Sequence, residues 1–365
     1  MSTGARSAGG EAVRGLWTGA IIDADVHIAA SYPVLVPYLD AYWREFVRER
    51  RPDVAGMRGV RRTYPPGAAS TRADWITADG RAAGSDLGLL SEAILDPLDI
   101  ECCVANCYFA LDAIRHPDFA AAMASAINDW LIDQWLSRDA RLRASLVVPA
   151  RNPPAMIKEI RRVGDHPGFV QVLMPVRSER PYGNRQWHQL LEAIAEHDLV
   201  FGLHFGGTAD GAPTPAGFPN HYFTEYVAEP ALYWAQITSL IAEGAFQQVP
   251  ALRVSVLEGG FTWLPHLAWR LTKEWRGMRR DIPWVDVAPT ELIRRHFRFS
   301  VAPLDCDDAD ELASTLERLG SDELLMFATD YPHWHDDDLV PLVTPMSQPA
   351  RAGLFAETAR SWYRL

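Results

Sequence analysis

Eight short apolar runs recur along the chain, and longer segments with helical periodicity separate most of them. The runs are rich in Val, Leu and Ile and occupy residues 20–28, 101–107, 142–150, 168–175, 199–207, 252–260, 296–303 and 323–330. Strands that alternate with helices form a parallel sheet buried on both faces. Eight such strands close into a (β/α)8 TIM barrel, which is the α/β fold that we predict. The alternative, an open doubly wound sheet, lacks a glycine-rich phosphate loop after the first strand.

The first 95 residues depart from this alternation in two places. Residues 1–18 are small and polar without the apolar segment of a signal peptide, so we expect a disordered tail there. We expect residues 19–365 to form one domain. Within it, residues 29–95 are rich in Pro, Arg and Gly, and they predict a long insertion after the first strand. Such an insertion lies over the carboxyl-end mouth of a barrel, where substrate binds.

Composition disfavours several classes of function. The formal net charge is −12 and no run is rich in Lys and Arg, so we do not expect nucleic-acid binding. No apolar run reaches the roughly 18 residues that a membrane span needs. Three of the four cysteines lie within residues 102–107. This spacing disfavours a disulfide framework and favours reduced thiols in a cytoplasmic protein.

Side chains that commonly ligate metals end four of the predicted strands. In chain order they are Asp25, His27, His204, Glu258 and Asp330, with His333 three residues further on. Each has an ordinary structural explanation, because strand histidines are usually hydrogen-bonded core residues and aspartates often begin turns. The strand ends of a barrel meet at one mouth, however, and four of them carry such groups. This coincidence favours a shared Zn²⁺ or Mn²⁺ ion.

Several motifs resemble those of the amidohydrolase-related metal-dependent hydrolases. They are "IIDADVHI", "LVFGLHFGG", "GAFQQVPALRVSVLEGGFTWLPHLAWRL", "FRFSVAP" and "LLMFATDYPHW". This branch of the amidohydrolase superfamily includes aminocarboxymuconate-semialdehyde decarboxylase and γ-resorcylate decarboxylase, and the resemblance covers roughly residues 19–340. It implies a barrel with one divalent ion, for which we expect zinc with manganese as the alternative. It also implies a homo-oligomer, which we expect to be a dimer, and the ligands Asp25, His27, His204 and Asp330.

Three features depart from the family pattern. Asp25 replaces the first histidine of the common HxH motif, as an acidic residue does in some relatives. The well-studied decarboxylases carry a histidine near the end of strand six, where this chain has Glu258. The fourth predicted strand supplies no lysine that could bridge two metal ions. The decarboxylase mechanism therefore does not carry over intact, and a binuclear site is disfavoured.

We predict a metal-dependent hydrolase in which a metal-activated water attacks an amide, lactone or related carbonyl. Asp330 or Glu258 would act as the catalytic base. The alternative is a non-oxidative decarboxylase or hydratase of a small carboxylic acid, a lyase in which His333 or Glu258 protonates carbon. A third possibility is a barrel that only binds a ligand, and the complete set of metal ligands argues against it.

Residues near the predicted mouth indicate the class of substrate. Arg177, which follows strand four, is a candidate to hold a substrate carboxylate, although an exposed loop arginine is the commoner explanation. Trp263 and Trp334 are candidate substrate-binding residues. An aromatic lining favours a small apolar or aromatic molecule. The aromatic residues near the mouth are Tyr108, Phe109, Phe205, Tyr222, Phe223, Trp263, Tyr331 and Trp334.

Overall fold

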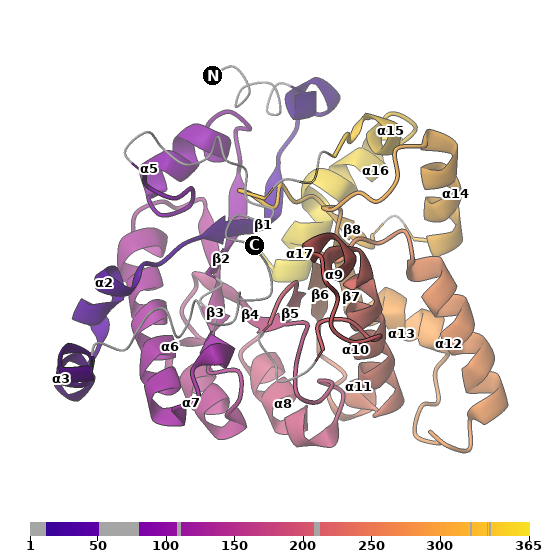
Figure 1. The fold of residues 1–365 in the computed structure, drawn as a ribbon. Helices are drawn as coiled ribbons and strands as arrows, with labels where there is room; N and C mark the ends of the chain where they lie inside the picture. Colours follow the sequence, from indigo (N-terminus) through magenta and orange to yellow (C-terminus); the bar gives the residue numbers. More distant parts are fainter. Residues whose placement is uncertain are drawn as a thin grey trace.

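The computed structural model describes residues 12–50, 80–107, 111–207, 212–321, 323–333, 335 and 337–365. Eight parallel strands stand side by side in sequence order (Figure 1). They are β1 (Ile22–Ile28), β2 (Cys102–Cys107), β3 (Leu142–Val147), β4 (Phe169–Pro175), β5 (Val200–His204), β6 (Val254–Leu257), β7 (Phe297–Ser300) and β8 (Leu325–Met326). A parallel bridge between Val26 and Tyr331 joins the first strand to the segment after the last. The structure therefore confirms the predicted (β/α)8 barrel.

Helices between the strands form the outer layer of the barrel (Figure 1). The longer ones are α6 (Pro117–Leu131), α7 (Pro153–Val163), α8 (His188–Glu196), α10 (Pro230–Ala242), α12 (Leu264–Met278), α13 (Pro289–His296) and α14 (Ala309–Leu319). Shorter helices are α9 (Tyr222–Ala228), α11 (Ala245–Gln248), α15 (Val340–Val343), α16 (Gln348–Ala352) and α17 (Thr358–Tyr363). Single turns are η5 (Leu111–Ala113), η6 (Ile132–Leu136), η7 (Arg185–Trp187) and η8 (Gly353–Glu357).

Local sequence explains where these helices begin and end. The carboxylate of Asp308 accepts hydrogen bonds from two backbone N–H groups at the start of α14. Gly320 ends the same helix with a φ of +65°, a left-handed conformation that glycine adopts without strain. In α7, Met156, Ile160 and Val163 recur at helical spacing and are buried. This apolar face holds the helix against the barrel.

The described part of the expected N-terminal tail is ordered. Residues 1–11 lie outside the described residues, whereas residues 12–16 are helical. The ring of Trp17 stacks on that of Phe355 at 5.8 Å between centroids, and its indole N–H donates to the carbonyl of Ala20. The end of the 1–18 segment therefore differs from the expected disorder, because a large aromatic side chain gains burial by packing on the barrel.

The expected insertion at residues 29–95 is described at its two ends, and residues 51–79 lie outside the described residues. It contains α2 (Tyr32–Leu35), η1 (Val36–Tyr38), α3 (Ala41–Arg50), α5 (Leu87–Leu90) and η4 (Ser91–Leu95). Trp43 and Phe46 of α3 pack on Phe119 in the first turn of α6. On its return, the chain accepts a hydrogen bond at Gly84 from the N–H of Ala29, just beyond β1.

The C-terminal helix α17 closes the amino end of the barrel. Trp362 and Tyr363 belong to one buried cluster with residues at the starts of the strands, including Ile22, Cys102 and Val200. In Figure 1 the chain ends beside α17, within the ring of strands. The carboxyl end of the barrel is thus left as the mouth.

Two further expectations concern cysteines and membranes. All four cysteines are free thiols, and the three in β2 are buried. Among the helices in the described part of the chain, none combines the length and apolar character needed to cross a bilayer.

Candidate metal centre

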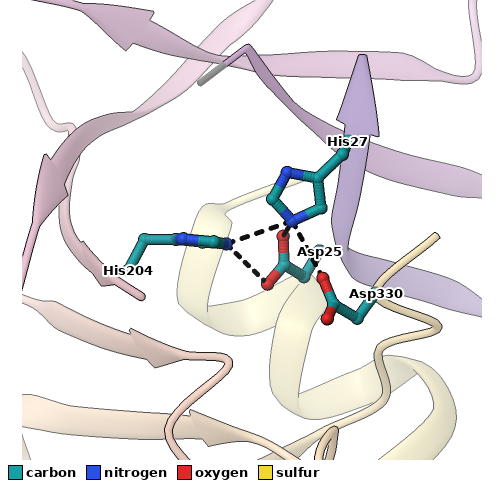
Figure 2. Close-up of side chains that lie close together, drawn as sticks. All are labelled: Asp25, His27, His204 and Asp330. Carbon is teal, nitrogen blue, oxygen red and sulfur yellow. Dashed lines mark hydrogen bonds and ion pairs between the residues drawn. The ribbon is translucent and has the colours of Figure 1, made fainter. Parts of the chain in front are cut away.

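Three separate strand ends bring the four predicted metal ligands to one point (Figure 2). Asp25 and His27 lie on β1, His204 is the last residue of β5, and Asp330 follows β8. All four side chains are buried, and one ligand atom from each lies within 4.8 Å of the others. The structure therefore assembles the predicted ligand set at the mouth of the barrel.

The distances between these ligand atoms match the spacing around a single ion. His27 Nε2 lies 3.2 Å from His204 Nε2 and 2.8 Å from Asp330 Oδ1. His204 Nε2 lies 3.3 Å from Asp25 Oδ2. Ligands bound at about 2.1 Å in tetrahedral or octahedral geometry are separated by about 3.0 to 3.4 Å. These three separations are thus close to those that one ion requires.

Neighbouring groups orient two of the ligands. His204 Nδ1 lies 2.9 Å from the carbonyl oxygen of Phe205, so Nδ1 donates to that oxygen and Nε2 is the nitrogen that faces the other ligands. The side-chain amide of Asn106 donates to Asp25 Oδ1 at 2.7 Å. Asp25 Oδ2 is buried and has no hydrogen-bond partner. A buried carboxylate oxygen without a partner is costly, and a bound cation would satisfy it. The residues therefore fit a divalent metal.

Backbone strain marks two residues of the site. Glu258 has a φ of +51° and Asp330 a φ of +49°, in the left-handed region that non-glycine residues rarely adopt. Such strain persists only where surrounding contacts enforce it. The N–H of Asp330 donates to the carbonyl of Asp25, and that of Glu258 donates to Ser300 Oγ. Both side chains are thereby held at the mouth.

A second group of side chains lies beside Asp330. His333 Nδ1 is 3.0 Å from Asp330 Oδ1 and 3.8 Å from Glu258 Oε1. His335 Nε2 contacts Asp330 Oδ2, and its Nδ1 is 3.1 Å from the hydroxyl of Tyr226. That hydroxyl donates to Glu258 Oε1 at 3.2 Å. The predicted catalytic residues Asp330, Glu258 and His333 thus form one connected cluster with two residues that we did not predict.

Burial and charge shift the protonation of this cluster in opposite directions. Burial, followed by the charge of Asp330, raises the pKa of Glu258 to about 7. For His333, burial lowers the pKa, but the charges of Asp330 and Glu258 outweigh it and raise the pKa to about 9. Burial would raise the pKa of Asp330, yet the neighbouring histidines hold it well below its usual value. Asp330 is therefore an ionised carboxylate.

Burial and charge also shift the pKa values of the two predicted ligand histidines in opposite directions. Burial is the largest cause of the lowered pKa of His27. Burial also acts to lower the pKa of His204, but the charge of Asp25 outweighs it and raises the pKa to about 10. The buried carboxylates at this point thus attract positive charge, which suits a site for a cation.

The contacts of the predicted substrate-binding residues do not by themselves indicate a substrate. Arg177 forms ion pairs of 2.7 Å with both Glu225 and Glu229, and all three side chains are largely buried. Its role toward a substrate carboxylate stays a prediction. The indole N–H of Trp263 donates to Gly259 O at 2.8 Å, just after β6. The other candidates Tyr108, Phe109 and Trp334 lie outside the described residues.

The remaining aromatic candidates differ in exposure. Phe205 and Tyr222 both pack on Tyr226, the residue whose hydroxyl reaches Glu258. Phe223 is 77% exposed, whereas Tyr331 is buried. Phe205 and Tyr222 therefore connect to the cluster through Tyr226, and Tyr331 directly follows Asp330 in the sequence.

Sequence reasoning missed Asn106, Tyr226 and His335. Asn106 interrupts an apolar strand, and a buried amide there is a recognisable indication of a hydrogen-bond role. His335 lies within five residues of Asp330, so the same motif could have revealed it. Tyr226 comes from α9 in a loop region, and nothing in the local sequence distinguishes it from other aromatic residues.

Comparisons with known proteins agree on the family and the fold. The sequence profile of a family described as Amidohydrolase matches residues 22–365. A γ-resorcylate decarboxylase from Rhodococcus jostii (strain RHA1) is 27% identical over 246 residues, which cover 61% of this chain and 70% of the relative.

Solved structures resemble the whole barrel. A 2,6-dihydroxybenzoate decarboxylase from Rhizobium superposes with a TM-score of 0.67 at 17% identity, covering 94% of this chain and 98% of that one. A 5-carboxyvanillate decarboxylase from Novosphingobium aromaticivorans, complexed with manganese and 4-hydroxy-3-methoxy-5-nitrobenzoic acid, superposes with a TM-score of 0.70 at 18% identity. It covers 95% of this chain and 96% of that one. At this identity the likeness shows the fold alone.

These findings overturn the prediction of a hydrolase. The relative matched by sequence is a decarboxylase. The prediction was wrong because a metal ligand set at a barrel mouth suits both reactions, and a carboxylate such as Glu258 can serve as a base in one and as an acid in the other. The alternative of non-oxidative decarboxylation is the better supported.

Proposed function

Because the chain belongs to the amidohydrolase family, we propose that it is a metal-dependent, non-oxidative decarboxylase of a small aromatic carboxylic acid. The observation that carries this proposal is the 27% identity over 246 residues to a γ-resorcylate decarboxylase. The decarboxylases that share the fold are named for 2,6-dihydroxybenzoate and 5-carboxyvanillate. In both acids a phenolic oxygen lies next to the carboxylate that is lost, and we propose this substrate class here.

The metal site supports the proposal. Asp25, His27, His204 and Asp330 would hold one divalent ion, which supplies positive charge to bind and orient the anionic oxygens of such an acid. We expect manganese in place of the predicted zinc. The third buried carboxylate, Glu258, adds oxygen donors that suit a harder ion, and the 5-carboxyvanillate decarboxylase structure contains manganese.

The chain must also deliver a proton. In non-oxidative decarboxylation the bond between the ring carbon and the carboxyl carbon breaks, and CO₂ leaves. The electron pair stays on the ring carbon, which takes one proton, so no oxidant or reductant is needed. A residue at the mouth must hold that proton and reach the ring.

His333 is the best placed proton donor. Its side chain is 20% exposed, whereas those of Glu258 and His335 are 1% and 5% exposed. Of these three side chains, that of His333 is therefore the most accessible to a molecule from solvent. Its Nδ1 contacts Asp330, which holds the imidazole in place and stabilises its protonated form. Glu258, at 3.8 Å from Nδ1, adds a second negative charge.

A panel assay tests the proposed function. Manganese-loaded protein would be incubated in D₂O with 2-hydroxybenzoates, including 2,6-dihydroxybenzoate and 5-carboxyvanillate. We expect CO₂ in equal amount to the decarboxylated arene, with one deuterium at the vacated ring position. A panel of esters, lactones and amides serves as the control. Absence of CO₂ from every acid would overturn the proposal.

Assembly and location stay proposals drawn from the sequence. We propose a homodimer in the cytoplasm that acts on a small molecule. Light scattering of the purified protein measures its mass in solution and would exclude the dimer if it gave the mass of one 40.7 kDa chain.

A further inference from the structure

We propose that Trp362 and Tyr363 position the carboxylate of Asp25 for the metal, through a directional hydrogen-bond chain across the barrel interior. The inference rests on the role of Asp25 as a metal ligand under the proposed function. It assigns a role to α17, which lies at the opposite end of the barrel from the mouth.

The first half of the chain runs from Asp25 to β4. Asn106 donates to Asp25 Oδ1 at 2.7 Å. The hydroxyl of Ser145 donates to Asn106 Oδ1 at 2.5 Å, and Gln171 Nε2 donates to Ser145 Oγ at 2.8 Å. These four side chains are fully buried on consecutive strands β1 to β4. Each amide uses its nitrogen toward Asp25 and its oxygen away from it.

The second half runs from β4 to the C-terminal helix. The hydroxyl of Tyr363 donates to Gln171 Oε1 at 3.1 Å. Ser255 Oγ lies 3.0 Å from the same hydroxyl, and Trp362 Nε1 donates to Ser255 Oγ at 3.1 Å. Because Tyr363 gives its only proton to Gln171, it accepts from Ser255. All of these side chains are buried.

The two end groups of the hydrogen-bond chain, Trp362 and Asp25, determine the direction in which its hydrogen bonds are donated. A carboxylate that binds a metal ion only accepts hydrogen bonds, and an indole N–H only donates. Every hydroxyl between Trp362 and Asp25 must therefore donate toward Asp25. Bonds aligned in one direction polarise one another, so each link strengthens the next. Reversal of any one link would leave a buried donor or acceptor unsatisfied.

The consequence at the mouth is a fixed carboxylate. Asn106 engages Oδ1, which leaves Oδ2 of Asp25 without a hydrogen-bond partner and 3.3 Å from His204 Nε2. The orientation of Asn106 depends on its hydrogen bond from Ser145. Ser145 is oriented in turn by Gln171, and Gln171 by Tyr363. Partners that orient a ligand commonly change metal affinity by about 10- to 100-fold.

The interior of the barrel leaves space for the hydrogen-bond chain at Gly202. A side chain at Gly202 on β5 would overlap the amide of Gln171, because the nearest heavy atoms to its ideal Cβ belong to that side chain. Glycine at this position therefore leaves the space in which Gln171 links β4 to α17. Gln171 thus has a dedicated place in an otherwise close-packed interior.

Metal affinity in variants along the chain tests the inference. Mn²⁺ would be titrated into chelator-treated protein and free Mn²⁺ followed by electron paramagnetic resonance. Tyr363→Phe keeps the ring and removes the link, and we expect the Kd for Mn²⁺ to rise about tenfold, the lower end for orienting partners. Ser145→Ala, two links from Asp25, should raise Kd at least as much.

Tyr182→Phe is the matched control. Tyr182 is also buried and donates to a backbone carbonyl, that of Pro175, outside the chain of bonds to Asp25. It should lose comparable stability, measured by urea unfolding without metal, and keep the wild-type Kd. A merely structural role for Tyr363 predicts the same behaviour for both tyrosine variants.

The outcomes separate this inference from the proposed function. If Tyr363→Phe and Ser145→Ala both bind Mn²⁺ within twofold of wild type, the positioning role is wrong while the metal site stands. If Tyr363→Phe does not fold, Ser145→Ala decides the question alone. If the folded wild-type protein binds no divalent ion, the metal site itself is wrong and the inference falls with it.

Discussion

At the scale of single residues, the imidazole of His204 is the ligand most firmly oriented for a metal. Its Nδ1 donates to a backbone carbonyl, which turns Nε2 toward the other ligands, where a metal ion would replace the proton on Nε2. We predict that His204→Ala raises the Kd for Mn²⁺ by more than about 100-fold, above the range for orienting partners. Elemental analysis after gel filtration measures the bound metal. His188→Ala, whose ring contacts Gly183 O away from the site, is the control.

Glu258 directly follows β6, and its side chain lies 3.8 Å from His333 Nδ1. We predict that Glu258→Gln keeps the metal but lowers kcat for CO₂ release by about 10²-fold or more, the scale of general acid–base catalysis. The substitution preserves shape and removes the negative charge near His333. Glu159→Gln, at another buried glutamate in α7, should leave kcat unchanged. Wild-type turnover in Glu258→Gln would reduce Glu258 to a structural role.

At the scale of elements, the seam between β1 and β8 holds two ligands in register. β8 is only two residues long, and Thr329 beyond it donates to Asp23 from its backbone N–H at 3.1 Å and its hydroxyl at 2.6 Å. We predict that Thr329→Val lowers the free energy of unfolding by about 1–3 kcal/mol, because the buried carboxylate loses a partner.

Thr238→Val is the control for this seam. Thr238 bonds only to the carbonyl of Trp234 within its own helix, as far as the described contacts go. Its loss should change the unfolding free energy by less than that of Thr329. Urea unfolding of both variants measures the difference in unfolding free energy. Equal losses would show that the hydrogen bonds of Thr329 to Asp23 contribute no more than a bond within one helix.

Helix α9 carries Tyr226 to the site and is held by Arg177. Two buried glutamates, Glu225 and Glu229, depend on this guanidinium. We predict that Arg177→Met costs about 3–5 kcal/mol of unfolding free energy, since it leaves buried carboxylates without their cation. Arg185→Met, at a more exposed arginine, should cost little. A raised KM for the acid with unchanged stability would instead support the predicted role in substrate binding.

At the scale of the whole molecule, a bound ion should stabilise the fold, because its ligands come from β1, β5 and the segment after β8. A metal at about 100 times its Kd adds about 2.7 kcal/mol of stability. We predict that Mn²⁺ raises the melting temperature of wild-type protein and that a chelator reverses the rise. His204→Ala should show no such response.

Acid should abolish this stabilisation. Histidine ligands bind metal only when neutral, so protons compete with the ion as pH falls. Because the pKa of His204 is raised to about 10, protons compete with the ion at every pH below that value. The difference in melting temperature between metal-loaded and chelator-treated protein should therefore still increase between pH 7 and pH 9, and it should vanish toward pH 5. A difference that persists at pH 5 would contradict ligation by His27 and His204.

Sequence alone was sufficient for the barrel and for the grouping of the candidate metal-ligating side chains. Strand and helix follow from local periodicity, and the carboxyl ends of parallel strands must share one mouth, so these strand-end groups could be placed together without coordinates. The family resemblance selected Asp25, His27, His204 and Asp330 among them as the ligands, which stays a prediction. The same reasoning could not choose between hydrolysis and decarboxylation, because a metal site of this composition serves either reaction. The likeness to decarboxylases corrected that choice.

Tertiary structure decided what connects the site to the rest of the barrel. The bonds from Tyr226 to Glu258 and from Tyr363 to Gln171 join segments that are far apart in sequence. Periodicity reports only which face of an element is buried, whereas such pairs depend on strand register and on how the chain ends pack. The polar interior that links Asp25 to α17 therefore exists only once eight strands have closed around it.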